Sequence, residues 1–225
     1  MAIYLIRHAQ SEGNARRVFQ GILDYPLTPR GREQAHALAR WLAALPVSPQ
    51  RVFASPLKRA AQTAEILAAE LGAHLPTGLP ELKEYHAGQI EGLTLDELGE
   101  RFPEYLTRGL DERGDFSRYG GESRADMHTR LRRFIARVEA EHAGDDILAV
   151  AHGGSLYQLL QLWCAWPTPR HVFTRLSNCC CLKLGLREVA GHKVAELQWF
   201  VTLELIAPEL LAEPPAGDAQ RTPAE

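Results

Sequence analysis

Two histidines in this sequence each follow a short apolar run that is typical of a buried strand. Residues 3–6 lead into Arg7 and His8, and residues 147–151 lead into His152, which two glycines follow. In open α/β sheets, ligands bind at the carboxyl ends of the strands, which is where both histidines are expected. An imidazole beside an arginine suits chemistry on an anion, and the N–H groups at a helix start also favour anions. The pattern therefore predicts a phosphate site.

One histidine after a strand is more often a simple loop residue, so neither motif carries this prediction alone. The polar side chains of Gln10, Ser11 and Asn14 follow His8 directly. A phosphate monoester resists attack because its oxygens are negative, so a catalyst needs fixed donors, a nucleophile and an acid for the leaving alkoxide. The two motifs together could supply the first two of these.

The sequence resembles the histidine phosphatase superfamily, the group of the cofactor-dependent phosphoglycerate mutases and many small phosphatases. The resemblance covers most of residues 1 to about 185. It rests on five matching stretches in the family's order: Leu5–Asn14, Phe19–Thr28 with Gly31 and Gln34-Ala35, Ser55–Ala64, Glu81–Gly88 and Ala151–Gly154.

The resemblance implies a role for each matching side chain. His8 would be the nucleophile that forms a phosphohistidine, and Glu84 would be the general acid and base. Catalytic roles are further implied for Arg7, Arg59 and His152, and substrate binding for Asn14, Gln20 and Gly153. Positive charge on Arg7, Arg59 and His152 should depress the pKa of His8 and keep it neutral for attack.

Two of these assignments compete with simpler ones. Glu84 could be a solvated loop carboxylate, and Glu81 is a nearby alternative for the acid. As an acid, Glu84 should lie in a partly desolvated position under a lid. Arg59 could be a solvated surface arginine, but its place at the start of a helix that follows a strand favours the site. His36, His74, His142 and His171 should be surface or structural residues, and His86 should at most line the pocket.

We expect a metal-independent phosphatase that acts on small phosphate monoesters, with no cofactor. A metal hydrolase needs clustered carboxylates and histidines, and Arg7 and Arg59 would repel a dication. The runner-up is a phosphoglycerate mutase, but the 68 positions from Glu84 to His152 are shorter than in mutases and lack lysine. A phosphate-binding protein without turnover is the alternative from another class. Five arginines of this span could read an acidic substrate: Arg101, Arg108, Arg113, Arg118 and Arg124.

Composition fits an ordinary globular protein. The chain has 225 residues, 45% of them hydrophobic, and a net charge of −3, which gives no argument for nucleic acid or membrane partners. Cys164 and the run Cys179–Cys181 lack metal-ligand spacing and are expected to be reduced core residues. No leader or spanning segment is evident, so the cytoplasm is the expected location, with a small phosphorylated metabolite as the partner and a homodimer as an open option.

The strand and helix patterns predict one α/β domain over residues 1–207, a three-layer α/β/α arrangement around a mostly parallel sheet. Strands are expected at residues 51–54, 178–184 and 196–203 besides the two histidine strands. Helices are expected at 29–45, 56–71, 122–142 and after His152, with Thr28, Ser55 and Ser123 as N-caps. Residues 73–120, inserted after the second helix, should form a lid, and 208–225 a disordered tail.

Overall fold

A six-stranded mixed sheet forms the centre of the computed structural model, which describes residues 1–107, 114–164, 176–189 and 192–211. The strand order is β3-β2-β4-β1-β5-β6, with β3, β2, β4 and β1 mutually parallel and β5 and β6 antiparallel to their neighbours. The strands are β1 Ala2–Arg7, β2 Arg51–Ala54, β3 Thr77–Gly78, β4 Ile147–Ala151, β5 Cys181–Val189 and β6 His192–Val201.

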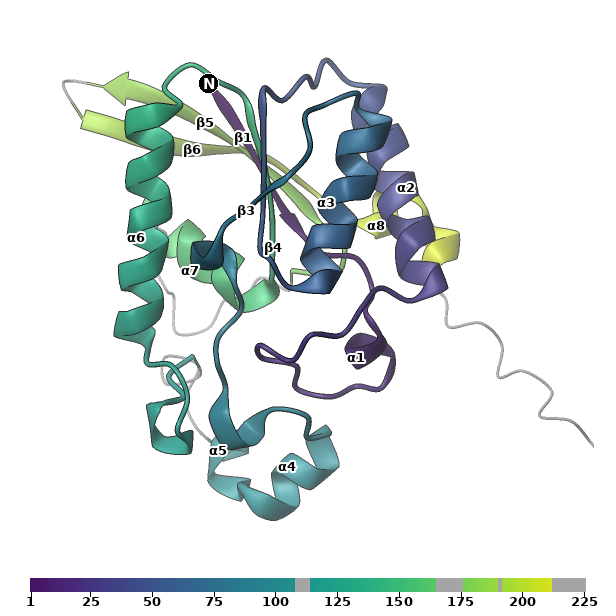
Figure 1. Ribbon diagram of the computed structural model, residues 1–225, viewed down its shortest axis with the longest axis vertical. Coiled ribbons are helices and arrows are strands. Elements are labelled where there is room, and N and C mark those ends of the chain that lie inside the picture. The colour runs from purple at the N-terminus through teal and green to yellow at the C-terminus, as the bar shows by residue number, and fades with distance from the viewer. Residues whose placement is uncertain (108–113, 165–175, 190–191, 212–225) are drawn as a thin grey trace, which may run out of the picture.

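Helices cover both faces of this sheet (Figure 1). On one face lie α2 Pro29–Ala43, α3 Lys58–Glu70 and the short α8 Leu203–Ile206; on the other lie α6 Arg124–Glu141 and α7 Gly153–Trp163. The predicted three-layer α/β/α class with a mostly parallel sheet is therefore confirmed.

The two cores follow from the alternation of side chains along β1. Ile3 and Leu5 point into the cluster shared with α6 and α7, whereas Tyr4 and Ile6 point into the cluster shared with α2 and α3. All four are 2% exposed or less, as expected for a strand covered on both faces. The inward stripe of α6 is also fully buried: Met127, Leu131, Phe134 and Val138.

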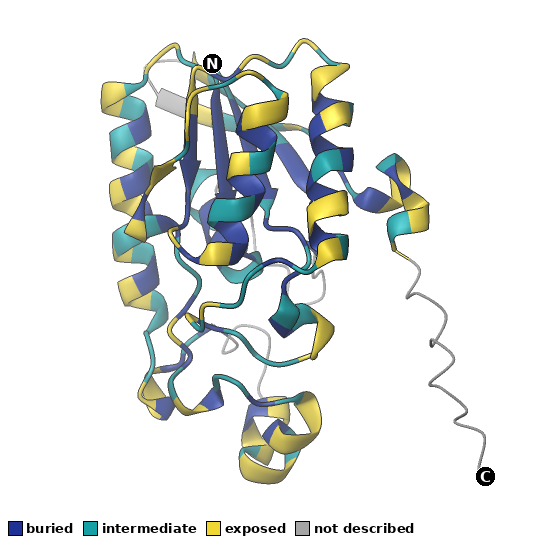
Figure 2. Cartoon of the chain, turned by 45° about the vertical axis from the view of Figure 1, so that its right-hand side comes forward, coloured by how far each residue is buried: buried dark blue, intermediate teal, exposed yellow. Residues whose placement is uncertain are grey.

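Short helices and irregular chain lie beyond the carboxyl ends of the parallel strands, most of them in the lower half of Figures 1 and 2. They include α1 Glu12–Ala15, α4 Leu95–Arg101, α5 Pro103–Thr107 and the 3₁₀ turns η1 Pro80–Leu82, η2 Gly88–Ile90 and η3 Ser117–Tyr119. Most of these fall in the region that the sequence analysis expects to be a lid. That role stays a prediction.

Two sequence predictions are corrected in detail. Ser55 does not cap α3, whose N-cap is Leu57 without a side-chain bond, because the Ser55 hydroxyl is used inside the molecule instead. Strand β5 begins at Cys181 and not at the expected residue 178, because Cys179 has a left-handed backbone (φ 55°) that belongs to a turn. Thr28 and Ser123 are N-caps as predicted.

The domain end predicted at residue 207 stays a prediction. The chain continues into η4 Pro208–Leu210, and the Leu210 carbonyl accepts hydrogen bonds from Arg30 Nε (2.9 Å) and Gln34 Nε2 (3.2 Å) of α2. The overall composition of residues 208–225 does not indicate this turn, although the apolar residues Leu210 and Leu211 lie within that stretch. The rest of the predicted tail, and Arg108, Arg113 and His171, lie outside the described residues.

Among the residues that the structure describes, no helix is long and apolar enough to cross a membrane. The expected cytoplasmic location and homodimer stay predictions.

Candidate active site

His8 is the first residue after β1 and is 2% exposed. Its Nδ1 lies 2.7 Å from the carbonyl oxygen of Ala9, and a carbonyl can only accept, so Nδ1 carries the proton. Nε2 of the neutral ring is then the unprotonated nitrogen. This tautomer is the one that a nucleophilic imidazole needs.

His152, the N-cap of α7, lies against His8, with 5.1 Å between the ring centroids. Arg59 Nε donates to His152 Nδ1 (3.2 Å), which makes Nδ1 an acceptor, and Nε2 lies 2.8 Å from the hydroxyl of Ser55. Both ring nitrogens are thus engaged by protein groups. The geometry makes His152 a neutral ring that orients the guanidinium beside it.

Arg59 is 1% exposed, so the alternative of a solvated surface arginine is wrong. Besides its bond to His152, it donates from Nη1 to the carbonyl of Leu23 and from Nη2 to that of Gly21, each at 2.7 Å. Three of its five N–H donors are thereby used, and one remains on each terminal nitrogen for an anion. Burial lowers its pKa to about 10, so it stays charged at neutral pH.

Burial is the largest cause that holds the pKa of His8 well below the usual 6.5, followed by the charges of Arg59 and Arg7. The predicted direction is therefore confirmed, but the sequence analysis omitted burial and counted His152 as a cation. Burial, then Arg59, His8 and Arg7, also hold the pKa of His152 well below 6.5. Both rings are neutral near pH 7 because a buried imidazolium beside two guanidinium groups is unfavourable.

The side chain of Glu84 lies against the N-terminus of α7, and the residue is partly buried. Its carboxylate accepts three backbone N–H bonds, from Gly154 to Oε2 (2.9 Å) and from Ser155 (3.2 Å) and Tyr85 (3.0 Å) to Oε1. It also acts on Arg59, whose pKa its charge raises. The carboxylate therefore faces the site, in the partly desolvated setting that the sequence predicted.

Glu81 points elsewhere. Its carboxylate lies 3.8 Å from the Arg137 guanidinium of α6 and, within the described ranges, accepts no hydrogen bond from the start of α7. The geometry therefore favours Glu84 over Glu81 as the acid. His86 is exposed, and His36 and His142 pair with Glu70 and Asp145 away from the site.

Arg7 and Gly153 lie side by side. A side-chain carbon at Gly153 would come within 3.7 Å of the Arg7 guanidinium, and Arg7 Nη1 donates to the Leu176 carbonyl. The Gly153 N–H donates to no group within the described ranges, whereas those of Gly154 and Ser155 are taken by Glu84. The first turn of α7 thus offers one N–H and its positive dipole end to an anion.

Asn14 and Gln20 are joined to this centre by Ser11 and by Asn178, of which only Asn178 was missed from the sequence. Asn178 Nδ2 donates to the carbonyl of His8 (2.9 Å) and to Asn14 Oδ1 (3.2 Å), and the Ser11 hydroxyl oxygen lies 3.0 Å from Asn14 Oδ1 and 2.7 Å from Gln20 Oε1. With Oδ1 occupied, Asn14 keeps its amide NH₂ for an outside acceptor. Ser11 was detectable as the cap of a Ser-x-x-Asn turn, but nothing in the sequence marks Asn178.

Within the described ranges, no three His, Cys, Asp or Glu side chains are grouped so that they could hold a metal ion. Nitrogen donors instead surround two buried, neutral imidazoles, and one carboxylate lies beside them.

The profile of the histidine phosphatase superfamily (branch 1) matches residues 3–197. The chain belongs to this superfamily. The resemblance inferred from the five motifs is thus confirmed, and the described fold is that of a histidine phosphatase.

Two curated histidine phosphatase relatives are similar over most of their length. Phosphoglycerate mutase-like protein 4 of Arabidopsis thaliana is 34% identical over 76% of this chain and 73% of that protein. Phosphoserine phosphatase 1 of Hydrogenobacter thermophilus is 31% identical over 67% of this chain and 70% of that protein.

Among solved structures, mycobacterial glucosyl-3-phosphoglycerate phosphatase in complex with VO3 is similar, with a TM-score of 0.76 and 27% identity. The match covers 88% of this chain and 97% of that chain. These relatives include both phosphatases and a mutase-like protein, so they give the chemical family and leave the reaction of this chain to its own residues.

Proposed function

We propose that this histidine phosphatase is a metal-independent hydrolase of small phosphate monoesters, with His8 as nucleophile and Glu84 as acid and base. One observation carries the proposal: the bond of His8 Nδ1 to the Ala9 carbonyl leaves an unprotonated Nε2 beside two guanidinium groups. Such a nitrogen can attack phosphorus while fixed cations neutralise the phosphoryl oxygens.

In the first step, the Nε2 lone pair of His8 forms a bond to phosphorus and the ester P–O bond breaks. The electron pair of that bond goes to the leaving oxygen, which takes a proton from the Glu84 carboxyl. The Arg59 and Arg7 guanidinium groups, the Asn14 amide and the Gly153 N–H stabilise the negative oxygens during transfer. His152 holds Arg59 in place.

In the second step, the Glu84 carboxylate takes a proton from water, and the water oxygen bonds to phosphorus. The P–N bond breaks, its electron pair returns to His8 Nε2, and inorganic phosphate leaves. Glu84 is protonated again, so acid and base alternate on one carboxyl.

The choice of hydrolase over mutase is supported by the span between Glu84 and His152, which contains no lysine for a second phosphate group. Two of the named relatives are phosphatases of phosphoserine and of glucosyl-3-phosphoglycerate, both phosphate esters of small acidic alcohols. We therefore propose a small phosphorylated metabolite as substrate, held under a lid formed by residues 73–120.

The test is turnover of a panel of phosphorylated metabolites, including both of those esters, in EDTA, followed by phosphate release. A parallel assay follows the interconversion of 3- and 2-phosphoglycerate. Phosphate release that EDTA leaves unchanged supports the proposal, whereas isomerisation without release would make the chain a mutase. Loss of release in EDTA would overturn the metal-independent mechanism, and no turnover at all would favour a phosphate-binding protein.

A further inference from the structure

The segment that carries Glu84 has no regular secondary structure of its own. Residues 83–87 follow η1 and belong to neither a helix nor a strand, so their backbone groups lack the hydrogen bonds of a helix or sheet. Leu82 is fully buried and anchors the preceding turn in the core. Beyond that anchor, the backbone carbonyls must find side-chain partners or water.

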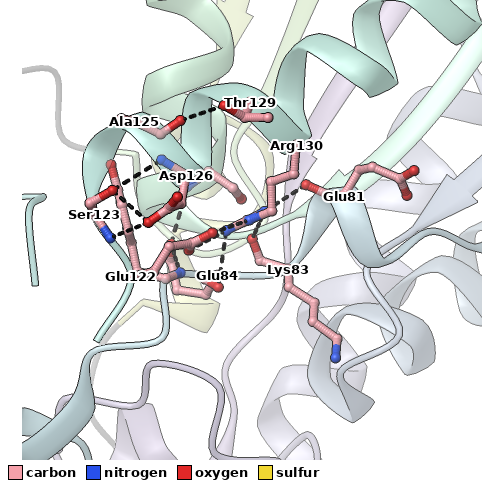
Figure 3. A network of polar contacts seen from close by, with 11 residues as sticks. Glu81, Lys83, Glu84, Glu122, Ser123, Ala125, Asp126, Thr129 and Arg130 are labelled. Atoms are coloured by element: carbon pink, nitrogen blue, oxygen red, sulfur yellow. Dashed lines mark hydrogen bonds and ion pairs between the residues drawn. The ribbon is translucent and has the colours of Figure 1, made fainter. Parts of the chain in front are cut away.

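One guanidinium supplies those partners. Arg130 of α6 donates from Nη1 to the carbonyls of Glu81 (2.6 Å) and Lys83 (2.8 Å), and from Nη2 to the carbonyl of Glu84 (3.2 Å). Figure 3 shows these bonds converging on Arg130 from the chain that carries Glu84. A single side chain therefore fixes the backbone at three carbonyls, those of Glu81, Lys83 and Glu84.

Glu122 in turn fixes Arg130. Its carboxylate accepts from Arg130 Nε (2.7 Å) and Nη2 (2.9 Å), a two-point pairing with only 11% and 15% of the two side chains exposed. The Glu122 N–H also donates to the His86 carbonyl (2.7 Å), so the same pair holds the segment just after Glu84 as well. A planar guanidinium can make this set of bonds, whereas an ammonium group cannot reproduce the fork.

We propose that Arg130, paired with Glu122, is the positioning residue of the acid and base Glu84. The α7 N-terminus holds the carboxylate, and α6 holds the backbone that delivers it. Within the described ranges, neither residue makes a hydrogen bond to His8 or Arg59, so we expect the pair to act on proton transfer and to leave phosphate binding intact. This inference rests on the proposed function, because it needs Glu84 as the acid.

The test compares two substrates that differ in their leaving group. Arg130→Met should lower kcat/KM by about 100-fold for the best alkyl phosphate of the panel, since a shift of about 1 Å at a catalytic group costs that much. For p-nitrophenyl phosphate, whose leaving group needs little protonation, the loss should stay within about threefold. The inhibition constant of inorganic phosphate should be unchanged.

Two further variants separate positioning from folding. Arg130→Met leaves the Glu122 charge without its partner, which destabilises the fold, whereas Arg130→Met with Glu122→Leu removes the whole ion pair and should recover stability. If positioning is the role, the double variant melts near the wild type but keeps the larger loss on the alkyl phosphate than on p-nitrophenyl phosphate. Arg130→Lys should give an intermediate ratio.

Arg137→Gln is the matched control, because Arg137 lies on the same helix but pairs with the side chain of Glu81 and is 39% exposed. It should leave both substrates unchanged. Equal losses of Arg130→Met on both substrates would overturn the inference, since a merely structural role reduces the folded fraction for both alike. Glu84→Gln separates the two proposals. If Glu84→Gln slows the alkyl phosphate more than p-nitrophenyl phosphate but Arg130→Met does not, only the positioning role of Arg130 is rejected. If Glu84→Gln slows both substrates equally, the assignment of Glu84 as the acid is rejected.

Discussion

The two sides of the site are held in place by different kinds of structure. On the phosphate side, His8 and His152 end the neighbouring parallel strands β1 and β4, and Arg59 opens the helix after β2. All three are buried by the core. On the acid side, Glu84 lies on irregular chain, and its position depends on α7 for the carboxylate and on Arg130 for the backbone.

The difference shows where precision comes from in each case. A strand end in a packed sheet is fixed by the close-packed core on both faces, so the phosphate side should tolerate single changes elsewhere in the molecule. The acid side depends on a few hydrogen bonds from two helices, so one substitution can move it. Variants should therefore fall into two groups. In one group the loss of kcat/KM is the same for every leaving group, and in the other it depends on the leaving group.

The largest effect is expected for His8→Ala on the phosphate side. Without the nucleophile, turnover should fall on the order of 10⁴-fold or more for every substrate, with native circular dichroism. Near-normal rates would reject the phosphohistidine mechanism. His36→Ala is the control, because His36 pairs with Glu70 on the surface and should leave turnover unchanged.

Glu84→Gln should give the next largest effect and should depend on the leaving group. Removing the proton donor should slow the alkyl phosphate by about 10²–10³-fold but p-nitrophenyl phosphate far less, as kcat/KM on both substrates would show. Glu81→Gln, three residues away with its carboxylate on Arg137, should show no such selectivity. The reverse result would make Glu81 the acid.

The neighbouring glycines of α7 allow a matched comparison of the two sides. A side-chain carbon at Gly154 would collide with Glu84 Oε1 and lie 3.0 Å from the Tyr85 ring, whereas at Gly153 it would make ordinary contact with Arg7. Gly154→Ala should therefore cost the alkyl phosphate about tenfold more than p-nitrophenyl phosphate. Gly153→Ala should change both substrates by the same small factor. Equal selectivity in the two variants would contradict the division into two sides.

The smallest effect is a pH dependence of stability that belongs to the phosphate side alone. The folded-state pKa values of His8 and His152 are lowered, so below about pH 6.5 the unfolded chain binds more protons and stability falls as the pH drops. Each ring should contribute up to about 1.4 kcal/mol per pH unit until the folded-state pKa is reached. Urea unfolding at pH 7 and 5.5 should show this loss, and His8→Asn should reduce it. An unchanged slope in that variant would reject the neutral buried state.

The phosphate side was predictable from sequence because its residues sit next to strong local signals. An apolar run predicts a buried strand, and the polar residue after it must then lie at the carboxyl edge of the sheet, as His8 and His152 do. An uninterrupted apolar run also indicates a strand covered on both faces, as β1 is. Burial of Arg59 did not follow from its neighbours, because a helix start can face either solvent or the sheet.

The acid side required the tertiary structure. Position 84 was inferred from family resemblance, but no local pattern places Arg130 46 residues later against its carbonyl, or Asn178 against the carbonyl of His8. The use of Ser55 as a partner for His152, in place of a helix cap, was equally hidden.

By itself, the sequence determined the layers of the fold, the two strand-end histidines and the family, because hydrophobic period and short motifs are local properties of the chain. Only the tertiary structure decided which tautomer His8 adopts, which charges surround it and what holds Glu84. The physical reason is that hydrogen bonds on irregular chain join residues far apart in sequence, and their partners are chosen by packing.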